Sequence, residues 1–258
     1  MPVKRRQSTR RYGWVRDLPD HRDFYYAAPC YVMAALPLRV DLRQYCPPVY
    51  DQGKLGSCTA NALAGAFAFC LKHQKNHVFS PSRLFIYYNE RALEGTVPVD
   101  GGAQLRDGIK SLNADGVCPE PHWPYKIERF AQAPPAKAYA EALGHQALGY
   151  QRVLQSLTQM KGCLANGFPI VLGFSVYESF ETPAVAISGI GVMPGPAESR
   201  IGGHAVLVVG YDDAKGRFLL RNSWGSKWGQ SGYFTLPYAY LIDPSLAADL
   251  WTLRIVEG

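Results

Sequence analysis

The sequence lacks a long hydrophobic run, a closely spaced cysteine pair and any internal repeat. None of its apolar runs reaches the roughly 20 residues that a membrane-spanning helix needs, so we expect no membrane partner. The cysteines form no CxxC pair, which argues against a zinc site. We therefore expect no metal and no organic cofactor. An even cysteine count could also mean disulfides, but reduced thiols fit this pattern better. The six cysteines are Cys30, Cys46, Cys58, Cys70, Cys118 and Cys163.

We also expect no secretory signal peptide. The start, Met-Pro-Val-Lys-Arg-Arg, is similar to the charged first part of such a signal. Charged residues between Asp17 and Asp23 then stand where a signal peptide has its apolar segment. A cytoplasmic location and export by another route both remain open.

The basic charge is concentrated at the amino terminus. Residues 1–23 carry seven Lys or Arg against three Asp, while the remaining residues carry 20 against 18. Such a segment could bind nucleic acid or anionic lipid. A solvated tail is the simpler interpretation, and no nucleic-acid recognition module is present. Nucleic acid is therefore not the expected partner.

The chain divides into an arm and one larger domain. Residues 1–35 (hereafter the arm) are irregular and rich in aromatic residues, whereas residues 36–258 are long enough to bury a substantial core. The first part of this domain, mainly 50–125, has helical apolar spacing. The second part, mainly 150–258, has short β-rich runs. Helices first and strands later predict the α+β class.

The expected elements follow from apolar spacing and from capping residues. An Ala-rich run predicts a buried helix over 58–72, and Ser80-Pro81 predicts an N-cap for a helix over 82–93. Further helices are expected over 104–114 and 150–166, and a loop over 119–135. Expected strands cover 170–176, 205–211, 218–221, 233–236 and 252–256.

A cysteine at the start of the Ala-rich run is the first candidate catalytic residue. In Asp51-Gln-Gly-Lys-Leu-Gly-Ser-Cys58-Thr-Ala-Asn61, it follows a glycine-containing loop and stands six residues after Gln52. The first turn of a helix offers unpaired N–H groups and the positive end of the dipole, and both favour a thiolate. Alone, such a cysteine is more often a core thiol. We predict a nucleophile because the chain also supplies a base and an orienting group.

These two partners are His204 and Asn222. His204 precedes Ala-Val-Leu-Val-Val-Gly-Tyr and stands 146 residues after Cys58; Asn222 follows 18 residues later in Asn-Ser-Trp-Gly. A histidine before a strand can be a satisfied core residue, and Asn-Ser starts many turns. The other five histidines have no such following strand, so we expect surface or structural roles for them.

Together the three segments resemble the papain family of cysteine peptidases. The resemblance covers roughly Leu36 to the end. It implies a two-lobed fold, with a helical lobe, a β-barrel-like lobe and the active-site cleft between them. It also implies a peptide or protein substrate and cleavage through a thioester acyl-enzyme.

The resemblance assigns a role to each candidate residue. Cys58 would be the nucleophile, and His204 would take its proton and later protonate the leaving amine. Asn222 would fix the imidazole, and Trp224 would cover that hydrogen bond. Gln52 and the backbone N–H of Cys58 would stabilise the oxyanion.

Small residues would line the substrate cleft by the same resemblance. Gly101 and Gly102 would let an extended substrate backbone pair as an added strand. A pocket for the second residue before the cut would be roomy, because the residues near it are Gly173, Gly202, Gly203 and Ala205.

The sequence departs from the family pattern at three positions. Leu55 replaces a cysteine that often forms a disulfide, Thr59 replaces an aromatic residue, and Gly203 replaces an acidic one. Gly-Gly-His-Ala also occurs in cathepsin B-like members, whose carboxydipeptidase activity needs a loop with paired histidines. The segment 119–124 contains one histidine, His122, and not a pair, so we expect an endopeptidase. The short arm and the missing disulfide cysteines suggest a bacterial type.

Two rival functions remain open. One is a thiol acyltransferase or transglutaminase-like enzyme, although those families usually complete the triad with Asp. The other is a catalytically silent papain-like binding protein, although such proteins usually lose the nucleophile. A separate hypothesis concerns the arm, whose residues near Gly13–Tyr26 would pack on the body, restrict the site and cause autoinhibition.

Overall fold

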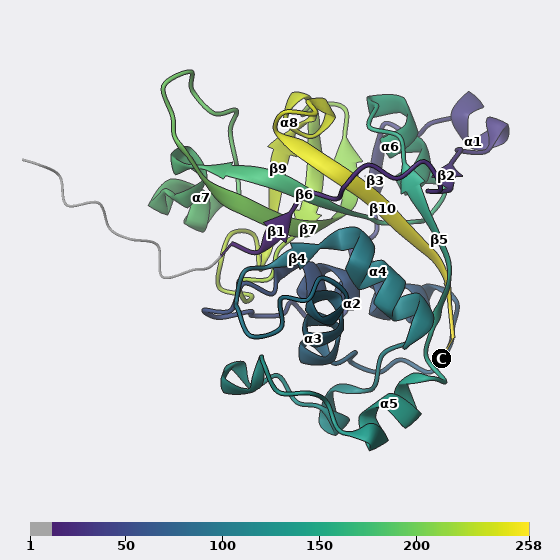
Figure 1. Cartoon of the computed structure of the whole chain (residues 1–258). Helices are drawn as coiled ribbons and strands as arrows, with labels where there is room; N and C mark the ends of the chain where they lie inside the picture. The colour runs from purple at the N-terminus through teal and green to yellow at the C-terminus, as the bar shows by residue number, and fades with distance from the viewer. Residues whose placement is uncertain (1–11, 258) are drawn as a thin grey trace, which may run out of the picture.

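A helical layer packs against a large β-sheet, and the arm lies along their junction (Figure 1). The computed structural model describes residues 12–257. The helices are α1 (Cys30–Ala34), α2 (Cys58–His73), α3 (Arg83–Leu93), α4 (Leu105–Ala114), α5 (Ala136–Ala142), α6 (Leu157–Ala165), α7 (Pro183–Ser188) and α8 (Tyr238–Ile242).

The strands belong to one large sheet and one small one. The large sheet has eight strands in the order β2-β5-β10-β6-β7-β8-β9, with β3 paired to β7. The small sheet joins β1 to β4. The strands are β1 (Trp14–Val15), β2 (Tyr25–Tyr26), β3 (Arg39–Asp41), β4 (Ala103–Gln104), β5 (Ala147–Val153), β6 (Ile170–Tyr177), β7 (Arg200–Asp212), β8 (Arg217–Arg221), β9 (Tyr233–Pro237) and β10 (Ala247–Val256).

The expected α+β class is confirmed, but the β-rich lobe is not a closed barrel. Its path ends at β2 on one side and β9 on the other, and these two strands do not pair. The lobe is therefore an open, mostly antiparallel sheet. β7 is its longest strand, with β3, β6 and β8 as partners.

The central helix begins at the predicted residue. Every side chain of α2 from Cys58 to Leu71 is buried, because the helix lies between α3, α4 and the sheet. This explains why its sequence is apolar nearly all round. The start of α2 is thereby fixed close to β7.

Two predictions about helices were wrong. The helix expected over 150–166 is strand β5, followed by α6, because residues 147–153 pair with β10. Ser156 caps α6 by accepting a hydrogen bond from the Gln159 N–H. A serine before a helix is a start signal, but the apolar spacing from residue 150 onward predicted an earlier start. The cap of α3 is Ser82, which accepts from Phe85 N–H, and not Ser80.

The arm contributes strands to both sheets. β1 pairs in parallel with β4, and β2 pairs in parallel with β5. The expected packing of the segment from Gly13 to Tyr26 is therefore present. Five of the arm's basic residues, Lys4, Arg5, Arg6, Arg10 and Arg11, lie outside the described residues, as does the predicted solvated basic tail.

Of the helices in the described part of the chain, none has the length and apolar character that crossing a bilayer requires. All six cysteines have free thiols.

Candidate active site

The start of α2 brings Cys58 beside the residue that follows His204. Cys58 is fully buried, and hydrogen bonds from the backbone of Ala205 and Gly13 reach its thiol. His204 lies on β7, directly opposite Phe174 of β6. The thiol and the imidazole, far apart in sequence, therefore come from two elements that pack together.

Asn222 holds the imidazole from the neighbouring strand. It follows the end of β8, which pairs with β7, and its Oδ1 lies 2.8 Å from His204 Nε2. The backbone N–H of Ser223 also donates to this oxygen at 2.8 Å, which fixes the amide orientation. Because an amide oxygen can only accept, Nε2 carries a proton and Nδ1 is the basic nitrogen.

Trp224 covers the histidine. Its ring stacks on His204 with centroids 4.7 Å apart and an angle of 25° between the planes. Both residues are buried, as is Asn222. Water is thus kept from the His204–Asn222 hydrogen bond, which strengthens it in the low-dielectric interior.

Gln52 is fixed close to the same loop. Its backbone N–H donates to the carbonyl of Ser223 at 2.9 Å, and its Oε1 accepts from the Ser223 hydroxyl at 2.7 Å. Its Nε2 donates to the Leu55 carbonyl at 2.9 Å. These three bonds hold the amide in one orientation near the start of α2.

The segment Tyr12–Trp14 of the arm occupies the cleft. The Gly13 carbonyl accepts from the Ala103 N–H at 2.8 Å. The Tyr12 ring meets the rings of His204 and Trp224 edge-on, with centroids 6.2 and 6.3 Å apart. This segment therefore lies over the groups that the sequence singled out.

Most of the predicted substrate-binding glycines contact this segment. A Cβ at Gly102 would lie 2.1 Å from the Gly13 carbonyl oxygen, and one at Gly202 would lie 2.5 Å from the Tyr12 ring. A Cβ at Gly173 or Gly203 would meet the Trp14 ring at 1.9 or 2.8 Å. Only Gly101 stands apart, since its nearest neighbour would be Val99 at 3.9 Å.

Burial raises the pKa of the Cys58 thiol to about 12, although backbone hydrogen bonds from Ala205, Gly13 and Thr59 lower it in part. The thiolate expected from the helix start is therefore disfavoured while the arm is in place. The dipole and free N–H groups of the helix favour a thiolate, but the loss of hydration outweighs them here.

Sequence reasoning missed a buried carboxyl beside the nucleophile. Thr59 donates to Glu90 Oε1 at 2.6 Å, and Glu90 is fully buried. Burial raises the pKa of Glu90 well above its ordinary value, which favours the neutral acid. A single acidic residue in the apolar helix expected over 82–93 was the available signal.

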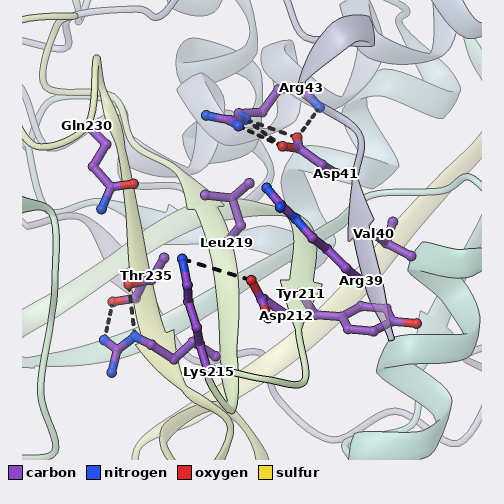
Figure 2. Close-up of a pocket in the computed structure, with 11 residues that line it drawn as sticks. Arg39, Val40, Asp41, Arg43, Tyr211, Asp212, Lys215, Leu219, Gln230 and Thr235 are labelled. Carbon is purple, nitrogen blue, oxygen red and sulfur yellow. Dashed lines mark hydrogen bonds and ion pairs between the residues drawn. The ribbon is translucent and has the colours of Figure 1, made fainter. Parts of the chain in front are cut away.

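The described residues form no metal-binding cluster. Among residues 12–257, no three His, Cys, Asp or Glu side chains lie close enough to hold a metal ion. Figure 2 shows a small hollow lined by residues at the Asp212 end of β7. Its volume is about 90 Å³. Two of its cations have carboxylate partners, Arg43 with Asp41 and Lys215 with Asp212. This hollow is separate from the cleft.

Comparisons with known proteins identify the family. Residues 36–240 match the papain family cysteine protease model. A peptidase C1-like protein of Acanthamoeba polyphaga mimivirus is 43% identical, over 96% of this chain and 88% of that protein. Cathepsin K of Gallus gallus is 29% identical, over 78% of this chain and 58% of that protein.

Solved structures show the same fold. Xylellain, a cysteine protease from Xylella fastidiosa, has a TM-score of 0.91 and 44% identity, over 99% of this chain and 100% of that one. Procathepsin B S9 from Trypanosoma congolense is 16% identical with a TM-score of 0.75, over 97% of this chain and 87% of that one. Because the relatives come from a virus, a bacterium and eukaryotes, the prediction of a bacterial type stays untested. The chain belongs to the papain family of cysteine proteases.

Proposed function

We propose that this protein is a cysteine endopeptidase whose nucleophile is Cys58 and whose base is His204. The observation that carries the proposal is the neighbourhood of the two groups: the thiol hydrogen-bonds to the backbone of Ala205, the residue after His204. The imidazole in turn is held through Nε2 by Asn222. A nucleophile, a base and an orienting group thus follow one another in space.

The fixed tautomer sets the direction of proton transfer. With Nε2–H bound to Asn222, Nδ1 takes the proton of Cys58 and forms a thiolate–imidazolium pair. The thiolate attacks the peptide carbonyl carbon and forms a C–S bond, and Nδ1–H then protonates the amine as the C–N bond breaks. Water hydrolyses the resulting thioester and restores the thiol.

Gln52 and the backbone N–H of Cys58 are proposed to stabilise the tetrahedral oxyanion. An oxyanion donor must already be oriented when charge develops, since reorientation would cost part of the gain. The contacts of Gln52 with Ser223 and Leu55 supply that orientation. We assign the side-chain amide of Gln52 to the oxyanion.

We further propose that the arm is an inhibitor within the same chain. Trp14 is held by a 3.1 Å hydrogen bond from its Nε1 to Asp249, and Gly13 is bonded to Ala103. A substrate that pairs with the cleft at Gly102 has to displace this segment, because both would occupy the same space. Turnover therefore requires the arm to leave.

Labelling and product analysis test the function. The full chain carrying Trp14→Ala, which loosens the arm, is incubated under reducing conditions with the epoxide thiol inhibitor E-64 and, separately, with a peptide blocked at both ends. We expect E-64 on Cys58 and internal cleavage of the peptide, both lost in Cys58→Ala. Cys70→Ala is the matched control, because Cys70 is an equally buried helix thiol outside the cleft.

The rival functions give different products. An acyltransferase would convert the peptide to an amide when an amine acceptor is added, whereas an endopeptidase yields the free carboxylate. A silent binding protein would neither cleave the peptide nor take up E-64, even when Trp14→Ala loosens the arm. Either result would contradict the proposal.

A further inference from the structure

Two arginines of the body, Arg106 and Arg152 (the arginine pair), are covered by the arm. Arg106 lies in the first turn of α4, and Arg152 lies near the end of β5. Their guanidinium carbons lie 5.7 and 5.2 Å from the centre of the Trp251 ring. Two cations thus share one aromatic surface.

Asp23 of the arm binds both guanidinium groups. Arg106 Nε and Nη2 donate to its two oxygens at 3.1 and 2.6 Å, and Arg152 Nη1 donates to Oδ2 at 3.1 Å. The side chains of Arg106 and Asp23 are only 6% and 8% exposed. A paired fork with little water access is the geometry in which arginine recognises carboxylate most strongly.

A second carboxylate of the arm, Asp17, lies beside the first. Its oxygens accept from the backbone N–H of Arg106 at 3.1 Å and from Trp251 Nε1 at 2.8 Å. Burial and the neighbouring Asp249 raise the pKa of Asp17 to about 6. Asp23 is therefore the position where the site favours an anion, and Asp17 is the weaker of the two.

The body offers the arginine pair little charge of its own. Within residues 12–257, all hydrogen bonds of the Arg106 side chain go to the arm, to Asp23 and to the Leu18 carbonyl. Arg152 has one partner on the body, Asp249, at 2.9 Å. When the arm leaves, two cations face a single carboxylate in a site built to hold anions.

We propose that the arginine pair is a docking site for an acidic segment of the protein substrate, which replaces Asp17 and Asp23 once the arm is displaced. This inference rests on the proposed endopeptidase function. Asp17 and Asp23 follow Trp14 by three and nine residues. The acidic residues of the substrate therefore lie several residues from the cut, on the side of the cleft where Trp14 lies.

Peptide binding to the full chain tests this site. The chain carries Trp14→Ala, Asp17→Asn and Asp23→Asn, which remove the arm's hold on the body. The probes are a fluorescent peptide with the sequence of residues 16–26 and the same peptide with Asn in place of Asp17 and Asp23. By fluorescence anisotropy, we expect the acidic probe to bind at least about tenfold more tightly at low salt, and the preference to shrink with salt.

Matched arginine variants test whether the arginine pair causes the preference for the acidic probe. Arg106→Gln and Arg152→Gln, each added to the loosened chain, should remove most of this preference. Arg129→Gln should leave it unchanged, although Arg129 also lies beside a tryptophan, with its guanidinium carbon 5.7 Å from the Trp123 ring. Circular dichroism checks that each variant is folded. If the triple variant does not fold, Asp23→Asn alone is used with the same probes.

Equal affinity of a folded, loosened chain for both probes would overturn the docking site. The outcome for catalysis is read separately, because binding needs no turnover. If the chain prefers the acidic probe but cleaves no peptide, the proposed endopeptidase function is refuted and the docking site is supported. A chain that cleaves neutral peptides but shows no preference would refute the docking site alone.

Discussion

The indole of Trp14 donates a hydrogen bond to Asp249 across 3.1 Å, although the two residues are 235 positions apart. Asp249 is buried on β10, and its other oxygen accepts from Arg152. The Trp14 ring lies over Gly173. Any residue other than glycine at position 173 would place its Cβ in the space that this ring occupies. One contact thus fills the cleft and fastens the arm to the sheet.

Loosening this contact should activate the enzyme. Trp14→Ala removes a buried aromatic side chain, a change that typically costs 3–5 kcal/mol. We expect a rise on the order of tenfold or more in the initial rate of peptide hydrolysis and in the rate of E-64 labelling of Cys58. Phe24→Ala is the control, because Phe24 is an aromatic residue of the same arm that is 78% exposed. Equal rates for Trp14→Ala and the unaltered chain would show that the arm does not limit access.

Removing the orienting amide should slow catalysis. Asn222→Ala, in the Trp14→Ala chain, takes away a hydrogen bond that holds an imidazolium, worth about 1.5–3 kcal/mol. We expect kcat/KM to fall by roughly 10- to 100-fold. Asn89→Ala serves as the control, since Asn89 is also buried and accepts a hydrogen bond, from Tyr139. An equal loss in both variants would mean that Asn222 acts only through stability.

The oxyanion donor should affect kcat more than KM. Gln52→Ala should lower kcat by about 10²- to 10³-fold, because the donor acts on charge that develops in the transition state. Steady-state kinetics in the Trp14→Ala background measures the effect. Gln146→Ala, which removes two hydrogen bonds to the backbone far from the cleft, should leave kcat unchanged. A change confined to KM would reassign Gln52 to substrate binding.

The arm should be held more tightly in mild acid. The pKa of Asp17 is about 6 when the arm is docked, against an ordinary 3.8, so docking takes up a proton. This stabilisation is fully present below about pH 4 and is lost as the pH rises through about 6. Between these two limits the free energy of arm docking changes by at most about 3 kcal/mol.

Hydrogen exchange of the arm amides, corrected for intrinsic rates, measures this dependence in Cys58→Ala protein. Protection should fall between pH 4 and 7, and Asp17→Asn should flatten the profile. Asp20→Asn is the matched control, because Asp20 bonds only to Arg22 within the arm. Protection that increases with pH would contradict the assignment.

The buried acid beside the nucleophile should make stability depend on pH. Burial raises the pKa of Glu90, so its contribution is fully present below its ordinary value of 4.5 and is lost as the pH rises through the raised value. Glu90→Gln keeps the acceptor for Thr59 and removes the ionisation. Thermal unfolding should show a smaller loss of stability as the pH rises above 4.5 for this variant. An equal or steeper loss than in the unaltered chain would contradict the raised pKa of Glu90.

Local sequence signals predicted α2, α3 and α4 and the candidate residues. The apolar run after Cys58, the strand after His204 and the tryptophan after Asn222 each identified an element and its end. The helix expected over 150–166 failed because period-3.6 spacing crossed a strand–helix boundary, and only pairing with β10 decides that residues 147–153 are extended. Strand pairing is non-local, so no window of sequence contains it.

The sequence by itself determined the family and the candidate nucleophile, base and orienting amide, because each lies in a short segment that carries its own pattern. Only the tertiary structure decided that Trp14 packs against Gly173, that burial raises the pKa of Cys58, and that Arg106 and Arg152 meet the carboxylate of Asp23. Those properties depend on burial and on charges brought together from distant segments, and both arise only when the arm, α4 and β10 meet.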